Sequence, residues 1–401
     1  MDISPAPFRL SAGAEKIKTL LVFGTRPEAV KMAPLALELA RRPEFDMRLC
    51  VTAQHRQMLD QVLEIFGLKP DHDLGIMKPS QTLTHITTGV LEGMMEVLAE
   101  EKPDIVLVHG DTTTTFAAAL AAFYARIPVG HVEAGLRTYD IYSPYPEEMN
   151  RRLTTQLASL YFAPTAQNRA NLEREHATAP VFVTGNTVID ALRSTVREGY
   201  RFHSAALSAL PAGRLILMTA HRRENLGEPL QNICRAVRRV AQTHPDVSVV
   251  YPVHLNPAVQ ETARAVLGGV PGIVLCDPLD VDDMHNLMAR ADLVLTDSGG
   301  LQEEAPALGK PVLVLRTETE RPEAVAAGTV RMAGVEEEKI FSMTSLLLDD
   351  AAEYRKMSHA ANPYGDGHAS GRIAQALLYA FGRGEAPKDF VPAPGAGAAR
   401  Q

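Results

Sequence analysis

The sequence predicts an α/β protein made of two doubly wound domains. Short apolar runs alternate with segments whose apolar residues recur at helical spacing, which is typical of βαβ units and parallel sheets. This alternation occurs in two successive series along 401 residues, a length that suits two or three domains. An eight-stranded barrel would alternate in the same way, so a barrel remains an alternative to two domains.

The first series covers residues 17–185 and gives an N-terminal domain. Apolar runs predict its buried strands at Ile17–Phe23, Phe45–Ala53, Ile105–His109 and Val129–Val132. Apolar residues at helical spacing predict the intervening helices at Ala29–Ala40, Met58–Leu68 and Thr82–Glu100.

The second series covers residues 186–370 and gives a C-terminal domain, with the boundary near Thr184-Gly185-Asn186. Its strands are predicted at Leu215–Thr219, Val247–Val253, Ile273–Leu275, Leu293–Thr296 and Pro311–Leu315. Residues 1–16 and 385–401 are rich in Pro, Ala and Gly, so they are expected to form a flexible and a disordered tail, respectively.

The composition argues against several classes of protein. Asp and Glu number 48 against 40 Lys and Arg, and the formal charge of −8 disfavours nucleic acid or an anionic membrane as the main partner. Cys50, Cys234 and Cys276 lie far apart, which excludes a disulfide framework and a cysteine-based zinc site. The first residues lack the features of a signal peptide, and a cytoplasmic location is expected.

Polar residues that directly follow apolar runs are the first candidates for a site, because ligands of open α/β sheets bind beyond the carboxyl ends of strands. Arg26 and Lys31 lie near a predicted helix N-terminus, where the dipole favours an anion, unless both are solvated surface cations. Asp111 and Glu133 follow two later strands. Asp111 could instead cap a helix, and Glu133 could form a structural ion pair with Arg137.

Two acids, Glu147 and Glu148, open a further predicted helix. Arg151 and Arg152 follow one turn later, and favourable pairing at i,i+4 would explain this pattern without any catalytic role. A functional carboxylate at Glu147 is the alternative.

The second half carries two more junctions of this kind. His221 and Arg222 follow one predicted strand, whereas Ser298, Gly299 and Gly300 lie between another strand and a helix start. Small residues at a helix N-terminus allow backbone N–H groups to approach a phosphate, although an ordinary capped helix would look similar.

Several cofactor motifs are missing from the sequence. No G-x-G-x-x-G follows a predicted strand, and the chain has neither a Walker A motif nor H-E-x-x-H. A bound nicotinamide or a catalytic metal is therefore not expected, and no cofactor is predicted.

Taken in order, these junctions resemble the non-hydrolysing UDP-N-acetylglucosamine 2-epimerases of bacteria over about residues 17–381. The matching stretches are FGTRPEAVKMAP, TAQHRQMLDQVLEIF, HGDTTTTFAAAL, VGHVEAGLRT, YPEEMNRR, TAHRRENLG, PVHLNP, LTDSGGLQEEAPALGKPVLVLR and TERPEAV.

The resemblance implies two Rossmann-like domains facing across a cleft, an architecture like that of glycosyltransferase-B enzymes. It implies that a helix within about residues 371–384 packs back on the N-terminal domain. It also implies a homodimer that interconverts UDP-GlcNAc and UDP-ManNAc without NAD, for cell-surface polysaccharide. Without a nicotinamide, the remaining route is elimination of UDP across C1–C2 and re-addition, which needs carboxylates to move protons and cations to stabilise the diphosphate.

The resemblance also suggests roles for individual residues. Acid/base roles are implied for Asp111, Glu133 and Glu147, and assistance to the leaving phosphate for His221. Substrate contacts are expected at Arg26, Lys31, Arg137, Ser298, Gly299, Gly300, Glu304 and Arg321. A regulatory UDP-GlcNAc site is implied at Gln54, Gln57, Arg222 and His254, although Ser80 stands where relatives often carry an arginine.

Three other functions remain open at this point. A glycosyltransferase would share the fold and the nucleotide pocket, and a hydrolysing epimerase would release free ManNAc and UDP. A catalytically silent sensor of sugar nucleotides is the third alternative.

Overall fold

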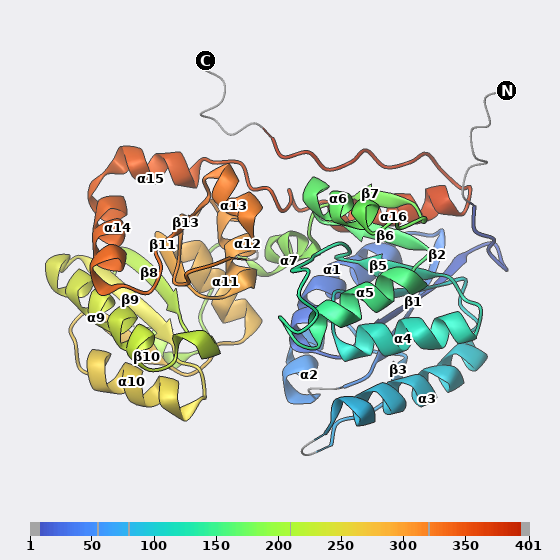
Figure 1. The fold of residues 1–401 in the computed structure, drawn as a ribbon, viewed down its shortest axis with the longest axis horizontal. Helices are drawn as coiled ribbons and strands as arrows, with labels where there is room; N and C mark the ends of the chain where they lie inside the picture. The colour runs from blue at the N-terminus through green and yellow to red at the C-terminus, as the bar shows by residue number, and fades with distance from the viewer. Residues whose placement is uncertain (1–8, 54–55, 79–80, 209, 320, 394–401) are drawn as a thin grey trace. The chain divides into compact units, whose positions relative to one another are not determined.

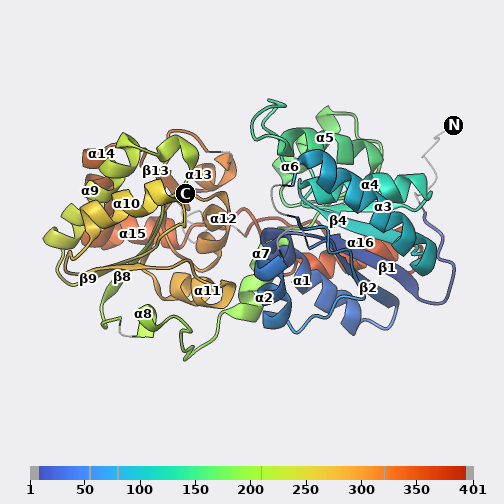
Figure 2. The same cartoon turned by 90° about the horizontal axis from the view of Figure 1, so that it is seen from below.

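Two open parallel sheets, each in its own unit, organise the chain in this computed structural model (Figure 1, Figure 2). The structure describes residues 9–393 apart from residues 54–55, 79–80, 209 and 320. Unit 1 is Met1–Ala191 with Gly365–Phe390, and unit 2 is built on Leu192–Tyr364. The predicted α/β class with two doubly wound sheets is confirmed, and the barrel is wrong because both sheets have open edges.

Unit 1 has a seven-stranded sheet in the order β3-β2-β1-β4-β5-β6-β7, and all its pairings are parallel. Its strands are β1 (Ile17–Phe23), β2 (Phe45–Val51), β3 (His72–Asp73), β4 (Ile105–His109), β5 (Val129–Val132), β6 (Leu160–Ala163) and β7 (Val181–Val183). Its helices are α1 (Arg26–Arg41), α2 (Arg56–Ile65), α3 (Leu83–Glu101), α4 (Thr113–Tyr124), α5 (Glu147–Leu157), α6 (Ala166–Arg174) and α16 (Ala369–Ala380). Helix α7 (Thr187–Thr195) carries the chain out of the unit.

Helices cover both faces of this sheet. Helix α4 packs between α3 and α5, whereas α1 packs against α16 (Figure 2). Strands β1 and β4 are buried along their whole length apart from Lys18. They read as continuous apolar runs because both of their faces are covered.

Unit 2 has a six-stranded parallel sheet in the order β10-β9-β8-β11-β12-β13. Its strands are β8 (Arg214–Thr219), β9 (Val247–Pro252), β10 (Ile273–Cys276), β11 (Leu293–Thr296), β12 (Val312–Val314) and β13 (Val330–Met332). Its helical segments are α8 (Ala205–Ser208), η1 (Arg223–Asn225), α9 (Glu228–Thr243), α10 (Pro257–Leu267), α11 (Val281–Arg290), α12 (Gly299–Ala307), α13 (Pro322–Ala327), α14 (Glu337–Asp349) and α15 (Ala351–Ser358).

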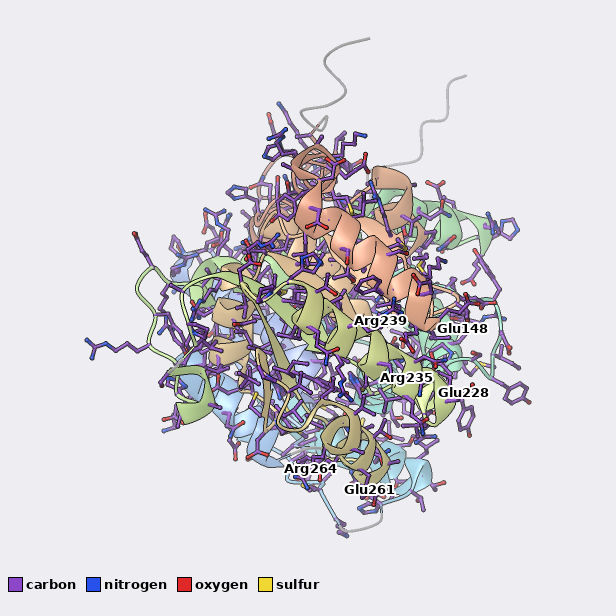
Figure 3. The ribbon with its side chains drawn as sticks, turned by 90° about the vertical axis from the view of Figure 1, so that its left-hand side faces the viewer. Glu148, Glu228, Arg235, Arg239, Glu261 and Arg264 are labelled. Atoms are coloured by element: carbon purple, nitrogen blue, oxygen red, sulfur yellow. The ribbon has the colours of Figure 1, made fainter. Side chains whose placement is uncertain are left out.

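The outer surface of unit 2 is rich in paired charges. Arg235 and Arg239 project from α9 (Figure 3), and they lie 3.0 and 3.1 Å from the carboxylate of Glu337 at the start of α14. These ion pairs link two neighbouring helices on the solvent side.

Each sheet reverses its strand order at one point. In unit 1 the reversal lies between β1 and β4, and in unit 2 it lies between β8 and β11. Crevices at such reversals, beyond the carboxyl ends of the strands, are where doubly wound sheets bind ligands. The loops that follow β1, β4, β8 and β11 are therefore the segments to examine for a site.

The expectation of a disordered tail from residue 385 onward is wrong for residues 385–393. The backbone N–H of Phe390 donates to the carbonyl of Val183 at 2.7 Å, and Asp389 forms an ion pair with Arg169 at 2.7 Å. Phe390 is 6% exposed. These contacts with the edge strand β7 stabilise a segment whose composition alone suggests disorder.

Part of the N-terminal tail expected at residues 1–16 is also bonded to the fold. The backbone N–H of Leu10 donates to the carbonyl of Ala380 at 2.7 Å, and that of Gly13 donates to Asp104 at 2.7 Å. No helix in the described part of the chain is long and apolar enough to cross a membrane.

Candidate active site

Glu133, directly after β5, is the centre of a polar cluster in unit 1. Its Oε2 lies 2.5 Å from Lys31 Nζ and 3.6 Å from His109 Nε2, and it accepts a hydrogen bond of 2.8 Å from Asn186 Nδ2. The Lys31 and Glu133 side chains are only 14% and 12% exposed. The structure therefore brings together two predicted site residues that are 102 positions apart in sequence.

The environment keeps this carboxylate ionised. Burial alone would raise the pKa of Glu133, but Lys31 and His109 overcome this effect and hold the pKa well below its usual range. Glu133 also adopts a φ of 61°, in the left-handed region that residues other than glycine rarely adopt. Such backbone conformations cluster at functional sites.

Asp111 follows β4 and pairs with Arg151 of α5. Arg151 Nη2 lies 2.7 Å from Asp111 Oδ2, and Nη1 of the same guanidinium bonds Glu148 at 3.1 Å. Asn150 donates to the Asp111 carbonyl at 2.9 Å. Helix α5 thus fixes the loop after β4, and the predicted i,i+4 pair between Glu148 and Arg152 is also present at 3.3 Å.

Glu147 is the first residue of α5 and is partly exposed. Its neighbour Glu148 is fully buried and accepts the backbone N–H groups of Thr138 and Tyr139 at 3.1 and 3.2 Å. The two adjacent acids therefore differ: Glu148 is committed to the fold, whereas Glu147 lies at the end of the helix nearer to solvent.

Glu28 ties the loops after β1 and β4 together. It accepts the backbone N–H groups of Gly24 and Thr25 at 3.1 and 2.8 Å, and the hydroxyl groups of Thr112 and Thr115 at 2.7 and 3.1 Å. Because Glu28 is 2% exposed and has four donors, this carboxylate is structural.

The position immediately after β1 has no room for a side chain, and Gly24 occupies it. A Cβ on Gly24 would lie 2.0 Å from the hydroxyl oxygen of Thr52 and 2.8 Å from that of Thr114. These two hydroxyl groups are hydrogen-bonded to each other at 3.1 Å. The absence of a side chain therefore allows β1, β2 and α4 to approach closely at the reversal of the sheet.

His131 of β5 supports the loop that carries Asp111. Its Nε2 lies 2.7 Å from the carbonyl of Gly110, and the side chain is fully buried. Burial lowers the pKa of His131 to about 4, so the ring is neutral and can donate this hydrogen bond at neutral pH. Gly110 has a φ of 67°, which glycine adopts without strain.

Arg137 does not form the structural ion pair with Glu133 that was one alternative from the sequence. Its side chain is 0% exposed, and its Nε and Nη2 bond the carboxylate of Glu175 at 2.8 and 2.7 Å. Its remaining nitrogen donates to the carbonyl of Leu136 at 2.7 Å. Arg26, in contrast, is the partly exposed first residue of α1.

In unit 2, Asp297 organises the reversal between β8 and β11. Its Oδ2 accepts the backbone N–H groups of His221 and Arg222, each at 2.7 Å, and the side-chain amide of Asn225 at 3.0 Å. Asp297 is fully buried. Sequence reasoning gave it no role, although it directly follows β11.

His221 lies on top of His254. The two rings stack with their centroids 5.2 Å apart and their planes 8° apart. Burial, together with His254 and Arg222, lowers the pKa of His221, although Asp297 acts in the opposite direction. The structure thus places two predicted regulatory residues beside a predicted catalytic one.

The turn from Ser298 to Gly300 begins α12, and two guanidinium groups flank it. A Cβ on Gly299 would lie 3.6 Å from Arg321 Nη2 and 4.0 Å from Arg222 Nη2. Arg321 is 8% exposed and its Nε bonds the buried carboxylate of Glu303. A helix N-terminus between two arginines is suited to a phosphate group.

Glu304 lies one turn into α12, where its side chain is 12% exposed and lies 3.4 Å from His285 Nε2. The other ring nitrogen of His285 is 2.7 Å from the hydroxyl of Thr195. Among the remaining predicted residues, Gln54 and Ser80 lie outside the described residues, and Gln57 lies in α2 with a side chain outside the described set.

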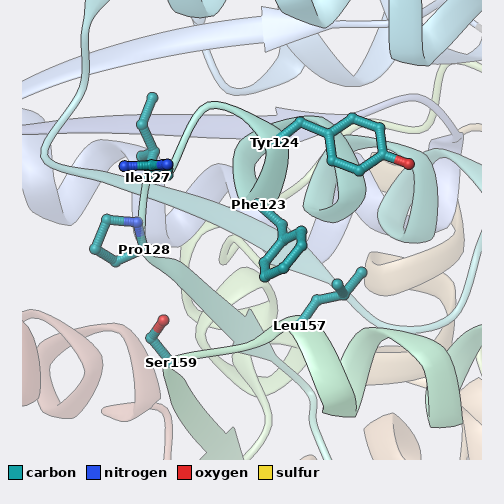
Figure 4. Close-up of a pocket in the computed structure, with 7 residues that line it drawn as sticks. Phe123, Tyr124, Ile127, Pro128, Leu157 and Ser159 are labelled. Carbon is teal, nitrogen blue, oxygen red and sulfur yellow. The ribbon is translucent and has the colours of Figure 1, made fainter.

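A surface hollow lies elsewhere in unit 1. It has a volume of about 560 Å³ and is lined by residues that include Phe123, Tyr124, Pro128 and Leu157 (Figure 4). Phe123 and Tyr124 are at the last turn of α4, whereas Asp111 precedes its first turn, about 18 Å away along the helix. The hollow is therefore separate from the cluster around Glu133.

One group of potential metal ligands occurs within the described residues, where atoms of His203, Asp280 and Asp283 lie within 4.8 Å of one another. Asp283 already accepts the hydroxyl of Tyr200 at 2.9 Å and the backbone N–H of Ser204 at 2.8 Å. These bonds attach the segment before α8 to α11.

Known proteins are similar to this chain in sequence and in structure. The family model described as UDP-N-acetylglucosamine 2-epimerase matches residues 37–378. The UDP-N-acetylglucosamine 2-epimerase of Bacillus subtilis is 58% identical over 379 residues, which are 94% of this chain and 99% of the relative. The crystal structure of UDP-GlcNAc 2-epimerase from Neisseria meningitidis bound to UDP-GlcNAc is 50% identical, with a TM-score of 0.83 over 90% of this chain and 100% of the other.

A more distant structure shares the fold alone. The glycosyltransferase SnogD from Streptomyces nogalater is 16% identical, with a TM-score of 0.55 over 90% of this chain and 99% of the other. This likeness supports the predicted glycosyltransferase-like class of fold. The match of the family model over most of the chain, together with relatives more than half identical along their whole length, makes this chain a member of the UDP-N-acetylglucosamine 2-epimerase family.

Proposed function

We propose that this chain reversibly epimerises UDP-GlcNAc to UDP-ManNAc at C2, by eliminating UDP and adding it back without a cofactor. The observation that carries this proposal is the buried pair of Lys31 and Glu133, which keeps a carboxylate ionised at the end of β5. An ionised carboxylate in a site of low exposure can accept a proton from a weakly acidic carbon. The crystal structure of the Neisseria relative is described as bound to UDP-GlcNAc.

Elimination and re-addition of UDP conserve all atoms and electrons, so the reaction needs no oxidant. A carboxylate takes the proton from C2, the C–H electron pair forms a C1–C2 double bond, and the C1–O bond breaks with its electrons passing to UDP. In the reverse addition, a proton is delivered to the opposite face of C2 and the UDP oxygen bonds C1 again. Asp111, Glu133 and Glu147 are the carboxyl groups proposed to move these protons.

Unit 2 is proposed to hold the nucleotide. The N-terminus of α12 at Ser298, Gly299 and Gly300, with Arg222 and Arg321 beside it, is suited to the diphosphate. His221, whose pKa is lowered, is proposed to assist the departing phosphate. Glu304 is proposed to bond the ribose, and Arg26 and Lys31 of unit 1 to contact the leaving group.

Family membership supports further parts of the proposal. The chain is proposed to act in the cytoplasm as a homodimer, and its product is proposed to supply ManNAc-type sugars for cell-surface polysaccharide. UDP-GlcNAc is proposed to regulate the enzyme through Gln54, Gln57, Arg222 and His254. Cooperative initial rates against UDP-GlcNAc would support this regulation, and hyperbolic rates would contradict it.

Proton NMR in D₂O tests the reaction directly. Purified protein with UDP-GlcNAc, without added NAD or metal, is expected to give UDP-ManNAc that carries deuterium at C2. Free ManNAc with UDP would show a hydrolysing reaction instead. An unchanged spectrum after confirmed binding would contradict the proposal and favour a transferase or a sensor.

A further inference from the structure

Asn186 contacts the carboxylate of Glu133 from a part of unit 1 that carries no predicted catalytic residue. It lies between β7 and α7, is 3% exposed, and donates through Nδ2 to Glu133 Oε2 at 2.8 Å. The other end of the same amide, Oδ1, accepts the backbone N–H of Val188 at 3.0 Å. Because both ends of the amide are bonded, its orientation is fixed and the N–H points at Glu133.

Asn186 and Lys31 have different effects on the same oxygen atom. Lys31 Nζ lies 2.5 Å from Glu133 Oε2 and supplies a positive charge from α1. Asn186 supplies a neutral donor to that oxygen from the far edge of the sheet. Two donors from separate elements hold Oε2 in place, so Oε1 is the oxygen that can take up a proton from a ligand.

Asn186 lies where the chain leaves unit 1, next to the point where the chain returns to it. The chain leaves unit 1 through α7, which begins at the next residue, and it returns to unit 1 at Gly365. A Cβ on Gly365 would lie 3.4 Å from the backbone nitrogen of Asn186 and 3.5 Å from its carbonyl oxygen. The outgoing and returning segments therefore touch at Asn186.

Further bonds fasten these two segments to each other. Asp190 of α7 accepts the backbone N–H groups of Ala369 and Ser370 at 3.1 and 2.8 Å, and so caps the N-terminus of α16. Arg372 of α16 donates to the carbonyl of Thr184 at 3.1 Å. Asn186 therefore lies in a region where two passages of the chain are bonded side by side.

We propose that Asn186 is a positioning residue for Glu133, held rigid by the paired segments 184–190 and 365–372. The inference rests on the proposed function, because it concerns the protonation of Glu133 during turnover. The charged and titratable groups facing Glu133 among the described residues are Lys31 of α1 and His109 of β4. Asn186 adds an uncharged hydrogen bond that favours the ionised form of the carboxyl group.

Two substitutions separate this role from simple support of the fold. Asn186→Asp keeps an oxygen for the N–H of Val188 but places a carboxylate against Glu133. Asn186→Ala removes the donor without adding charge. Both changes raise the pKa of Glu133, so the limb of the pH–rate profile that Glu133 controls moves to higher pH, whether Glu133 acts as base or as acid.

Asn168→Asp is the matched control. Asn168 is also buried in unit 1 and its Oδ1 accepts a backbone N–H, from Thr165 at 3.1 Å, but its amide faces the carbonyl of Gly135 rather than Glu133. This substitution introduces the same charge at a similar depth. It is expected to lower the melting temperature and to leave the pH–rate profile in place.

The experiment measures kcat and kcat/KM for UDP-GlcNAc from the lowest pH at which each variant remains folded up to pH 9, with melting temperatures for each variant. We expect a shift of about one pH unit for Asn186→Asp, equivalent to about tenfold in the ionisation constant, and a smaller shift in the same direction for Asn186→Ala. The change in activity should appear in kcat more than in KM, because Asn186 is proposed to act through Glu133 and not on the substrate.

The outcomes are distinguishable. Unshifted profiles for both folded variants, with wild-type turnover intact, would overturn this inference alone. If Asn186→Asp fails to fold, the profile of Asn186→Ala decides. Absence of epimerisation by the wild-type protein would overturn the proposed function and this inference with it.

Discussion

The carboxylate of Asp297 accepts the backbone N–H of His221 at 2.7 Å, and this bond joins the two strand ends at the reversal of the second sheet. The same oxygen accepts the N–H of Arg222 at 2.7 Å. Two consecutive residues after β8 are thus oriented by one residue after β11. The position of the imidazole proposed to assist the leaving group therefore depends on a fully buried acid.

Replacing Asp297 by alanine should both destabilise unit 2 and reduce turnover. Two backbone N–H groups would lose their acceptor, which costs about 2–5 kcal/mol of unfolding free energy in total. Urea unfolding and initial rates measure the two effects. Asp297→Asn keeps an acceptor oxygen and should be affected less, and equal stability of the wild type and the alanine variant would contradict this account.

Lys31→Met should lower kcat/KM by about 100-fold, because an isosteric apolar side chain leaves Glu133 without its charged partner. Without Lys31, burial raises the pKa of Glu133, and the pH–rate profile shifts upward. Lys18→Met is the control, since Lys18 pairs with Glu101 at 3.0 Å in the same unit but lies at the amino-terminal end of β1. A similar loss in both variants would mean that Lys31 acts only through stability.

His131 should make the stability of the protein depend on pH between about 6.5 and 4. Its pKa is 6.5 in the unfolded chain and about 4 when buried, so the unfolded state binds a proton first as the pH falls. Stability from this residue is complete above pH 6.5 and is lost toward pH 4, by about 3 kcal/mol.

Urea unfolding at a series of pH values tests this dependence. His131→Gln keeps a donor for the carbonyl of Gly110 but cannot titrate, so its unfolding free energy should fall less steeply than that of the wild type. His359→Gln, at an exposed histidine of unit 2, should follow the wild-type curve. Parallel curves for all three proteins would show that His131 is not the titrating group.

Gly299→Ala should weaken UDP binding without disturbing the fold. The added methyl group meets only ordinary contacts, 3.6 Å from Arg321 and 4.0 Å from Arg222, but it occupies space between these guanidinium groups at the start of α12. We expect the Kd for UDP by calorimetry to rise about tenfold or more, with an unchanged melting temperature.

Gly89→Ala provides the comparison for Gly299. A Cβ at Gly89, within α3, would meet Ile76 at 3.4 Å, and alanine is a better helix former than glycine. This variant should bind UDP as the wild type does. Unchanged affinity in Gly299→Ala would remove α12 from the proposed diphosphate site.

Strand ends were predictable from the sequence because parallel strands buried on both faces form continuous apolar runs. The runs at Ile17–Phe23, Ile105–His109 and Leu293–Thr296 coincide with β1, β4 and β11. The short strands β6 and β7, of four and three residues, were not predicted, whereas β5 and β11, also of four residues, were.

Partners of the site residues were much harder to predict. The loop position of Glu133 follows from a local pattern, but its contact with Asn186 joins residues 53 positions apart. An ion pair of Glu133 with Arg137, four residues away, was one alternative, and Arg137 instead pairs with Glu175, 38 positions away. Local spacing contains no information about which distant element packs against a strand end, so these pairings required the structure.

The return of the chain to unit 1 sets an order for folding during synthesis. Helix α16 packs on α1, and Phe390 bonds β7, yet both follow Leu192–Tyr364 of unit 2 in the sequence. The strands and helices of unit 2 all lie within Leu192–Tyr364, so its core can close before residues 369–390 have left the ribosome. Unit 1 is therefore completed after the core of unit 2, and it remains without one of its covering helices until residues 369–380 have been synthesised.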